Sequence, residues 1–64
     1  MSLSRKHYQA IAQIMQVRLE TARTENDRGA IDAVCDTIYD LSCYFKTDNQ
    51  AFQRDRFLEA CGIQ

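Results

Sequence analysis

Residues 29–46, with the sequence GAIDAVCDTIYDLSCYFK, carry the most regular pattern in the chain. Apolar or small side chains recur there at three- and four-residue spacing, which places them along one side of an α-helix. The stripe consists of Ile31, Val34, Cys35, Ile38, Leu41, Ser42 and Phe45. Because the rest of the chain must cover this face, the segment predicts the central helix of an all-α domain.

The opposite side of the same segment carries Asp32, Asp36 and Asp40, one helical turn apart. Like charges at this spacing repel one another by about 0.2–0.5 kcal/mol per pair. No histidine, glycine-rich loop or enclosing pocket accompanies them, so a solvated row is favoured over a metal site or a catalytic acid–base pair. Since nothing nearby offsets the repulsion, the row suggests contact with a basic surface on a protein partner.

A helix over about residues 4–24 is expected to begin at Ser4, with Leu3 and Tyr8 packed together across its first turn. Its apolar positions divide into two stripes. The main stripe consists of Tyr8, Ile11, Ala12, Met15, Leu19 and Ala22, and the second consists of Leu3, Ala10, Ile14 and Val17. In a small helical domain the second stripe is either core or a surface for self-association or another partner, and both interpretations stay open.

Residues 24–27, TEND, contain no apolar side chain and predict a turn, with Asn26 or Asp27 capping a helix over about residues 27–46. So short a connection makes the two long helices antiparallel neighbours. The next helix is expected to end at about Lys46, with residues 47–49 breaking it.

The last segment, residues 52–62 (FQRDRFLEACG), predicts a short helix over about residues 54–61. With Gln53 as N-cap, Phe52 and Phe57 can close over the first turn, and Gly62 supplies a left-handed stop. These residues are expected to make the fold rather than a site. The expected architecture is therefore a single domain, residues 1–64, in which a short third helix folds across one end of a helical hairpin.

Composition narrows the function classes. The chain has 64 residues, eight basic and nine acidic side chains, a net charge of −1 and three cysteines. This balance disfavours a dedicated nucleic-acid binder, and no apolar run approaches the roughly 20 residues of a membrane span. The cysteines form no C-x-x-C unit and are expected to be reduced cytosolic thiols, with Cys35 in the core and only Cys43 or Cys61 available for reaction. The only histidine, His7, is expected to be solvated.

No nucleophile, metal or phosphate motif is recognisable, which predicts a non-enzymatic protein without a cofactor. No charged-then-apolar leader is present either, so we expect a cytoplasmic protein. Two basic groups of residues remain to be explained. Arg5 and Lys6 oppose the helix dipole and could meet an acidic partner, whereas Arg54 and Arg56 loosely imitate the recognition helix of a DNA-binding helix-turn-helix.

Residues 48–62, DNQAFQRDRFLEACG, resemble the C-terminal end of small proteins encoded by phages of actinobacteria, which finish in a pattern like N-P-x-F-D-x-x-R-F-L-x-A-C-G. The resemblance covers about the last quarter of the chain, with looser similarity in a helical hairpin that starts near His7. Gln50 stands where that family often has Pro, and Gln53 where it often has Asp. The resemblance implies a phage protein in the bacterial host cytoplasm and indicates no catalytic or binding residues.

The favoured hypothesis is therefore a small phage accessory protein that acts through protein–protein interaction. Its partner would be a second copy, as in a homodimer, or a host protein. The candidate contact residues are those of the second stripe and the acidic row. The alternative is a small helix-turn-helix-like regulator that binds DNA.

Overall fold

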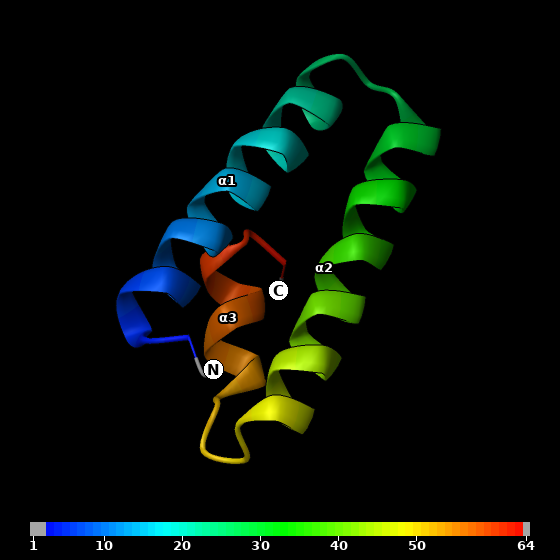
Figure 1. The fold of residues 1–64 in the computed structure, drawn as a ribbon. Helices are drawn as coiled ribbons and strands as arrows, with labels where there is room; N and C mark the ends of the chain where they lie inside the picture. Colours follow the sequence, from blue (N-terminus) through cyan, green and yellow to red (C-terminus); the bar gives the residue numbers. More distant parts are fainter. Residues whose placement is uncertain (1–2, 64) are drawn as a thin grey trace.

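The computed structural model describes residues 3–63, which form α1 (Arg5–Thr24), α2 (Arg28–Asp48) and α3 (Arg54–Ala60) (Figure 1). The first two helices form a long antiparallel hairpin, and the short α3 lies against it near the end where the chain begins. The predicted all-α architecture is confirmed, including the antiparallel hairpin and the short third helix.

The core lies where the three helices meet. Phe45 of α2 is its centre, with ring centroids 5.0 Å from Tyr8 and 5.4 Å from both Phe52 and Phe57. Such tilted and edge-to-face arrangements are favourable for aromatic rings. The buried cluster takes residues from every helix and from the segment before α3: Ala12, Leu19, Ile38, Phe45, Phe52, Phe57 and Cys61.

The turn between α1 and α2 uses each of its residues differently. Asn26 adopts a left-handed backbone, with φ of 54°, and its N–H donates to the Arg23 carbonyl at 3.0 Å. The Asp27 N–H donates to the Ala22 carbonyl at 3.0 Å, which completes a Schellman motif. The Asp27 carboxylate then accepts from the Ala30 N–H at 3.1 Å and caps α2. Of the two predicted caps, the structure selects Asp27.

Helix α2 continues to Asp48, two residues beyond the expected end. Thr47 does not break the helix, and its hydroxyl donates to the Cys43 carbonyl at 3.0 Å, one turn earlier. Asn49 follows the helix as its C-cap. Its side-chain oxygen accepts from the Ala51 N–H at 3.1 Å, which fixes the turn of the following loop. The Lys46 ammonium donates to two carbonyls of this loop, those of Gln50 and Phe52.

Helix α3 has only seven residues, so its stability depends on contacts with the rest of the chain. The rings of Phe52 and Phe57 lie 5.6 Å apart across its first turn, as predicted. Gly62 ends it with φ of 94°, also as predicted, and its N–H donates to the Glu59 carbonyl at 3.0 Å. The Arg23 guanidinium of α1 donates to the Gly62 carbonyl at 3.3 Å and ties the two helices together.

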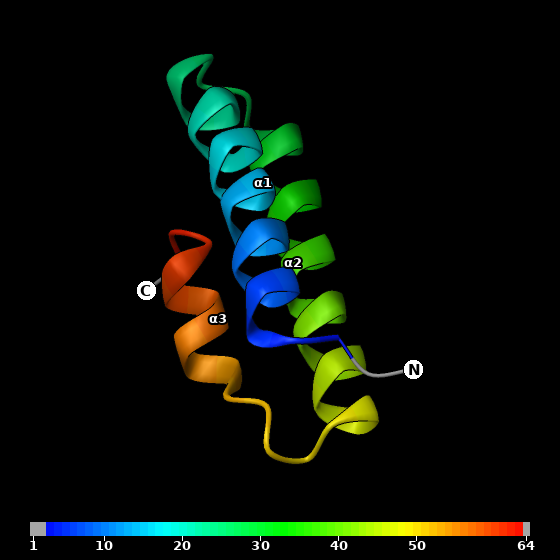
Figure 2. The ribbon, with the colours of Figure 1, turned by 60° about the vertical axis from the view of Figure 1, so that its left-hand side comes forward.

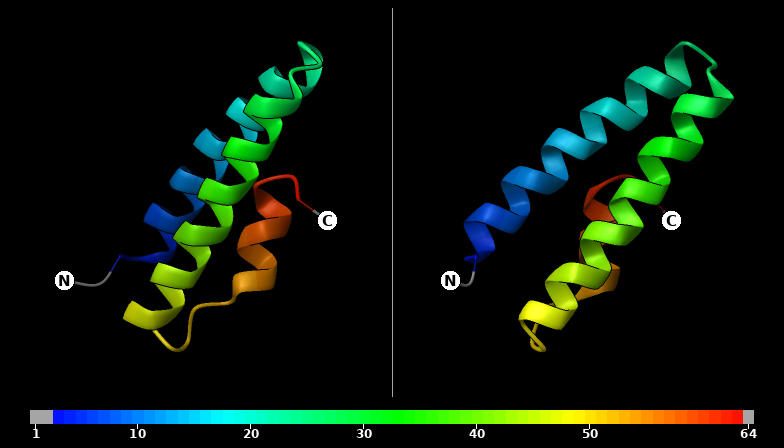
Figure 3. Two further views of the ribbon diagram at one scale, coloured as in Figure 1. Left: turned by 90° about the vertical axis from the view of Figure 1, so that its right-hand side faces the viewer. Right: turned by 45° about the vertical axis from the view of Figure 1, so that its right-hand side comes forward.

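Helix α3 covers one face of the hairpin and leaves the other without a helical neighbour. The two turned views agree: α3 lies on one side of the α1–α2 pair in Figure 2 and in the left panel of Figure 3. In a two-layer arrangement of this kind, no further helix of residues 3–63 lies over the outer sides of the hairpin.

Candidate functional site

The second apolar stripe of α1 is not a single surface. Ile14 and Val17 retain 61% and 55% of their accessible surface, and Ala10 is also exposed. The interpretation of these residues as core is therefore wrong. Leu3, in contrast, is half-buried and packs against the core cluster, so it does not belong with the other three. We call Ala10, Ile14 and Val17 the outer strip of α1.

The acidic row of α2 is fully at the surface. Asp32, Asp36 and Asp40 are all exposed, and none of the side-chain hydrogen bonds within residues 3–63 involves them. Within this same part of the chain, no three histidine, cysteine or acidic side chains lie close enough to hold a metal ion. The row therefore supplies negative charge to the outer side of α2 without forming a ligand set.

Two tyrosines of α2 extend this outer surface, and sequence reasoning did not single them out. Tyr44 is 65% exposed and follows Asp40 by one helical turn, so it continues the acidic row with an aromatic ring. Tyr39 is 43% exposed. The available signal was their position outside the apolar stripe of residues 31–45. Exposed tyrosines suit protein contacts because the ring is apolar and the hydroxyl remains polar.

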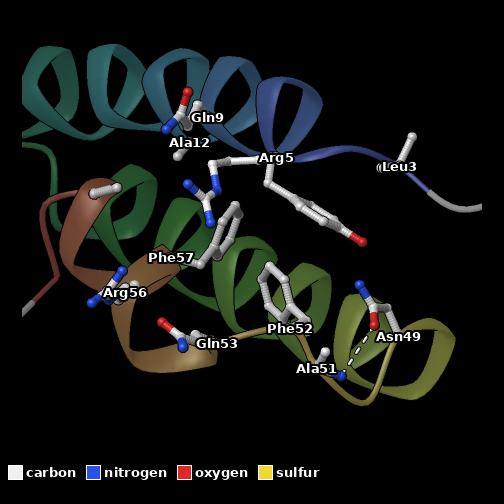
Figure 4. A pocket seen from close by; sticks show the side chains of 12 residues that line it. Leu3, Arg5, Gln9, Ala12, Asn49, Ala51, Phe52, Gln53, Arg56 and Phe57 are labelled. Carbon is white, nitrogen blue, oxygen red and sulfur yellow. Dashed lines mark hydrogen bonds between the residues drawn. The ribbon is translucent and has the colours of Figure 1, made fainter.

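A pocket of about 440 Å³ opens between the start of α1, the loop after α2, and α3 (Figure 4). Its apolar wall contains the rings of Tyr8, Phe52 and Phe57. The hydroxyl of Tyr8 is buried and has no hydrogen-bond partner among the residues that the structure describes. The pocket is lined by Leu3, Arg5, Tyr8, Gln9, Ala12, Asn49, Ala51, Phe52, Gln53, Arg56, Phe57 and Ala60.

The basic residues noted in the sequence separate into two kinds. Arg54 belongs to the fold, because its Nε donates to Oγ of the buried Ser42 at 3.2 Å and joins α3 to α2. Arg5 and Arg56 are exposed, line the same pocket, and donate none of the hydrogen bonds found in residues 3–63. The pocket contains no acidic side chain. It therefore combines two free guanidinium groups with aromatic surface.

His7 is exposed, as expected, but it also contributes to the start of α1. Its Nδ1 lies 3.1 Å from the backbone nitrogen of Ser4 and accepts that N–H, while the Ser4 hydroxyl lies 3.0 Å from the same ring nitrogen. In the neutral ring the proton consequently belongs on Nε2. His7 acts as the third-position partner in a capping box, a role usually filled by Glu or Gln.

The three thiols differ in access. Cys61 is fully buried, and burial raises the pKa of its thiol to about 11. The expectation that Cys61 could react is therefore wrong, because the thiolate is the reactive form. Cys43 is exposed, and Cys35 is half-buried against the core cluster. All three are free cysteines.

None of the helices in residues 3–63 has the length and apolar character needed to cross a membrane. A scan of protein-family models and searches of curated proteins and of solved structures gave no significant match to this chain.

Proposed function

We propose that this chain is a small, non-enzymatic, phage-encoded accessory protein that works in the cytoplasm through contact with another protein. The observation that carries the proposal is the outer strip of α1, where Ile14 and Val17 stand more than half exposed. Ile14 and Val17 are three positions apart and therefore lie on one side of α1. Aliphatic side chains at this spacing are typical anchors where a helix binds another protein. The phage setting rests on the sequence resemblance of residues 48–62 alone.

The charges of the two long helices favour a second copy as the partner. Helix α1 carries four basic side chains and one acidic side chain, whereas α2 carries two basic and four acidic ones. Arg5 lines the pocket beside α3 and Arg23 donates to Gly62, so Lys6 and Arg18 are the basic side chains of α1 that remain for a partner. A two-fold dimer can place α1 of one copy against α2 of the other, so that each basic helix faces an acidic one. In that arrangement the acidic row receives the compensating charge that its own helix lacks. A host protein with a basic, apolar surface would satisfy the same requirement.

DNA binding has less support. Arg54, one of the two arginines that would face DNA, is engaged by Ser42, and Phe57 of the same short helix is buried in the core. The acidic row would add repulsion from phosphates. Arg56 is exposed and free, but it lines a pocket with aromatic walls, and α3 is only seven residues long.

Sedimentation velocity from low to high micromolar concentration tests self-association. The wild-type protein should form a reversible dimer, because burying Ile14 and Val17 removes apolar surface from water. The Val17→Glu variant should stay monomeric, since a buried unpaired carboxylate opposes association. Gln50→Glu is the matched control, because it adds the same charge at an exposed position in the loop after α2, away from the strip, and it should associate like the wild type.

A wild-type protein that remains monomeric at high micromolar concentration would remove self-association from the proposal. A host partner would then be tested by its binding to wild type and Gln50→Glu but not to Val17→Glu. A gel-shift assay at low salt covers the alternative function, and salt-sensitive binding to duplex DNA would replace the proposal altogether.

A further inference from the structure

The pocket beside the start of α1 gathers Arg5 from α1 and Arg56 from α3, residues far apart in the sequence. Figure 4 shows the Arg5 side chain extending from α1 toward Phe57, with Arg56, the residue before Phe57, on α3. We propose that this pocket binds a carboxylate attached to an aromatic or aliphatic body. This site is separate from the outer strip of α1, and the proposal does not depend on self-association.

The charge of the pocket points to an anion. Arg5 and Arg56 are both free of hydrogen bonds to other described residues, and none of the lining side chains is acidic. Two guanidinium groups at the rim of one cavity make its potential positive, which attracts an anion. The start of α1, a helix of 20 residues, adds the positive end of its dipole on the same side. A carboxylate matches the planar donor pair of each guanidinium.

The walls of the pocket point to an apolar body on the same ligand. Phe52 and Phe57 form part of the lining, together with Leu3. A volume of about 440 Å³ suits a small organic molecule or the last residue of a peptide, since ligand pockets commonly span roughly 300–1,000 Å³. The side-chain amides of Gln9 and Gln53 add groups that could orient the ligand.

Tyr8 supplies a further indication. Its ring lines the pocket, and its buried hydroxyl has no partner among the described residues. An unsatisfied buried hydroxyl is costly. A modest adjustment of this wall on ligand binding would allow the hydroxyl to gain a hydrogen bond, which favours a ligand that carries a polar group next to its apolar part.

N-acetyl-L-phenylalanine is a suitable probe, because it carries a free carboxylate beside an aromatic ring. Titration into ¹⁵N-labelled protein should shift the amide resonances of residues 3–12 and 49–60, with a dissociation constant on the order of 1 mM for a ligand of this size. Its neutral carboxamide, and inorganic phosphate, which lacks the apolar body, should each bind at least about tenfold more weakly. Equal binding of the carboxamide would overturn the carboxylate assignment, and equal binding of phosphate would overturn the need for an apolar body.

Two variants and a control locate the site. Arg5→Gln and Arg56→Gln should each weaken binding about tenfold, because each removes a charge-assisted hydrogen bond. Both arginines are exposed, and the amide spectrum of each variant reports directly whether the fold is retained. Arg18→Gln removes the same charge from an exposed position of α1 outside the pocket and should leave binding unchanged. Equal weakening in all three variants, or no shifts in the pocket segments, would overturn the proposal.

Discussion

Asn26 and Gly62 are the two described residues with a left-handed backbone, and each ends a helix with the same pair of hydrogen bonds. Asn26 tolerates this conformation because its short polar side chain is compatible with it. At Gly62 the value of φ, 94°, is strained for any residue with a Cβ, and an added Cβ would lie 3.8 Å from Cδ2 of Leu19. That distance is an ordinary van der Waals contact, so the left-handed backbone, and not a lack of space, favours glycine at this position.

The thiol of Cys61 should make stability depend on alkaline pH. Burial raises its pKa from 9.0 to about 11, so the folded protein holds the proton more tightly than the unfolded chain. The unfolded thiol ionises first as the pH passes about 9, and the free energy of unfolding falls as the pH rises through about 11. Below pH 9 the contribution of this group is fully present.

Urea denaturation of wild type and of Cys61→Ala isolates the contribution of this thiol. The measurements run from about pH 7.5 to about pH 10.5, a range that brackets the ionisation of the thiol in the unfolded chain. The wild-type free energy of unfolding should fall more steeply across the range, because the variant lacks the titrating thiol while sharing the tyrosines and other cysteines. Parallel pH profiles for the two proteins would contradict the assignment.

Among the elements, α3 has the weakest start. Its N-cap, Gln53, makes no side-chain hydrogen bond to the helix, whereas α2 has a carboxylate cap in Asp27. The helix is held instead by the Phe52–Phe57 contact, by the Gly62 stop and by the bonds from Arg54 and Arg23 to neighbouring elements. The first turn of α3 can therefore be stabilised further by a better N-cap residue.

Gln53→Asp should raise the free energy of unfolding by up to about 1 kcal/mol, because a carboxylate can accept from a first-turn N–H and favours the positive end of the helix. Gln53→Ala is the matched control and should change stability little, since no capping bond is lost. Thermal or urea unfolding measures both. A gain in Gln53→Ala as large as that in Gln53→Asp would show that capping is not the cause.

Periodicity was sufficient to predict the elements and most of their ends. The stripe of residues 31–45, the Phe52–Phe57 contact and the Gly62 stop each rest on neighbours within a few turns of one another, and all three are present. The end of α2 was misplaced because Thr47 and Asp48, which were expected to break the helix, are accommodated in its last turn, and Asn49 is the first residue with an extended backbone.

The candidate sites were harder to predict because they depend on how α3 docks. Periodicity shows that Ile14 and Val17 lie off the main stripe, but not whether α3 covers them. The pocket was harder still to predict, because Arg5 and Arg56 line one cavity only through the packing of α3 beside the start of α1. The sequence marked both arginines as unexplained charges without indicating that they share one cavity.

At the scale of the molecule, the fold has two unequal sides. Helix α3 covers one face of the hairpin (Figure 3). The aromatic cluster around Phe45 lies where α3 meets the two long helices. The outer sides of α1 and α2 carry exposed apolar, acidic and tyrosine side chains. A chain of this length buries only about 60% of the surface of its unfolded form. Each large apolar side chain left outside the core therefore lowers a stabilisation that is already small.

The central claim is that the outer strip of α1 is surface that the fold of one copy does not need. The free energy of unfolding of an Ile14→Glu, Val17→Glu double variant, measured by urea at low micromolar concentration, tests it most directly. We predict a change within about 0.5 kcal/mol, as for ordinary surface substitutions, whereas Leu19→Ala in the core should cost about 2–5 kcal/mol. A loss in the double variant comparable to that of Leu19→Ala would show that the strip is core and contradict the claim.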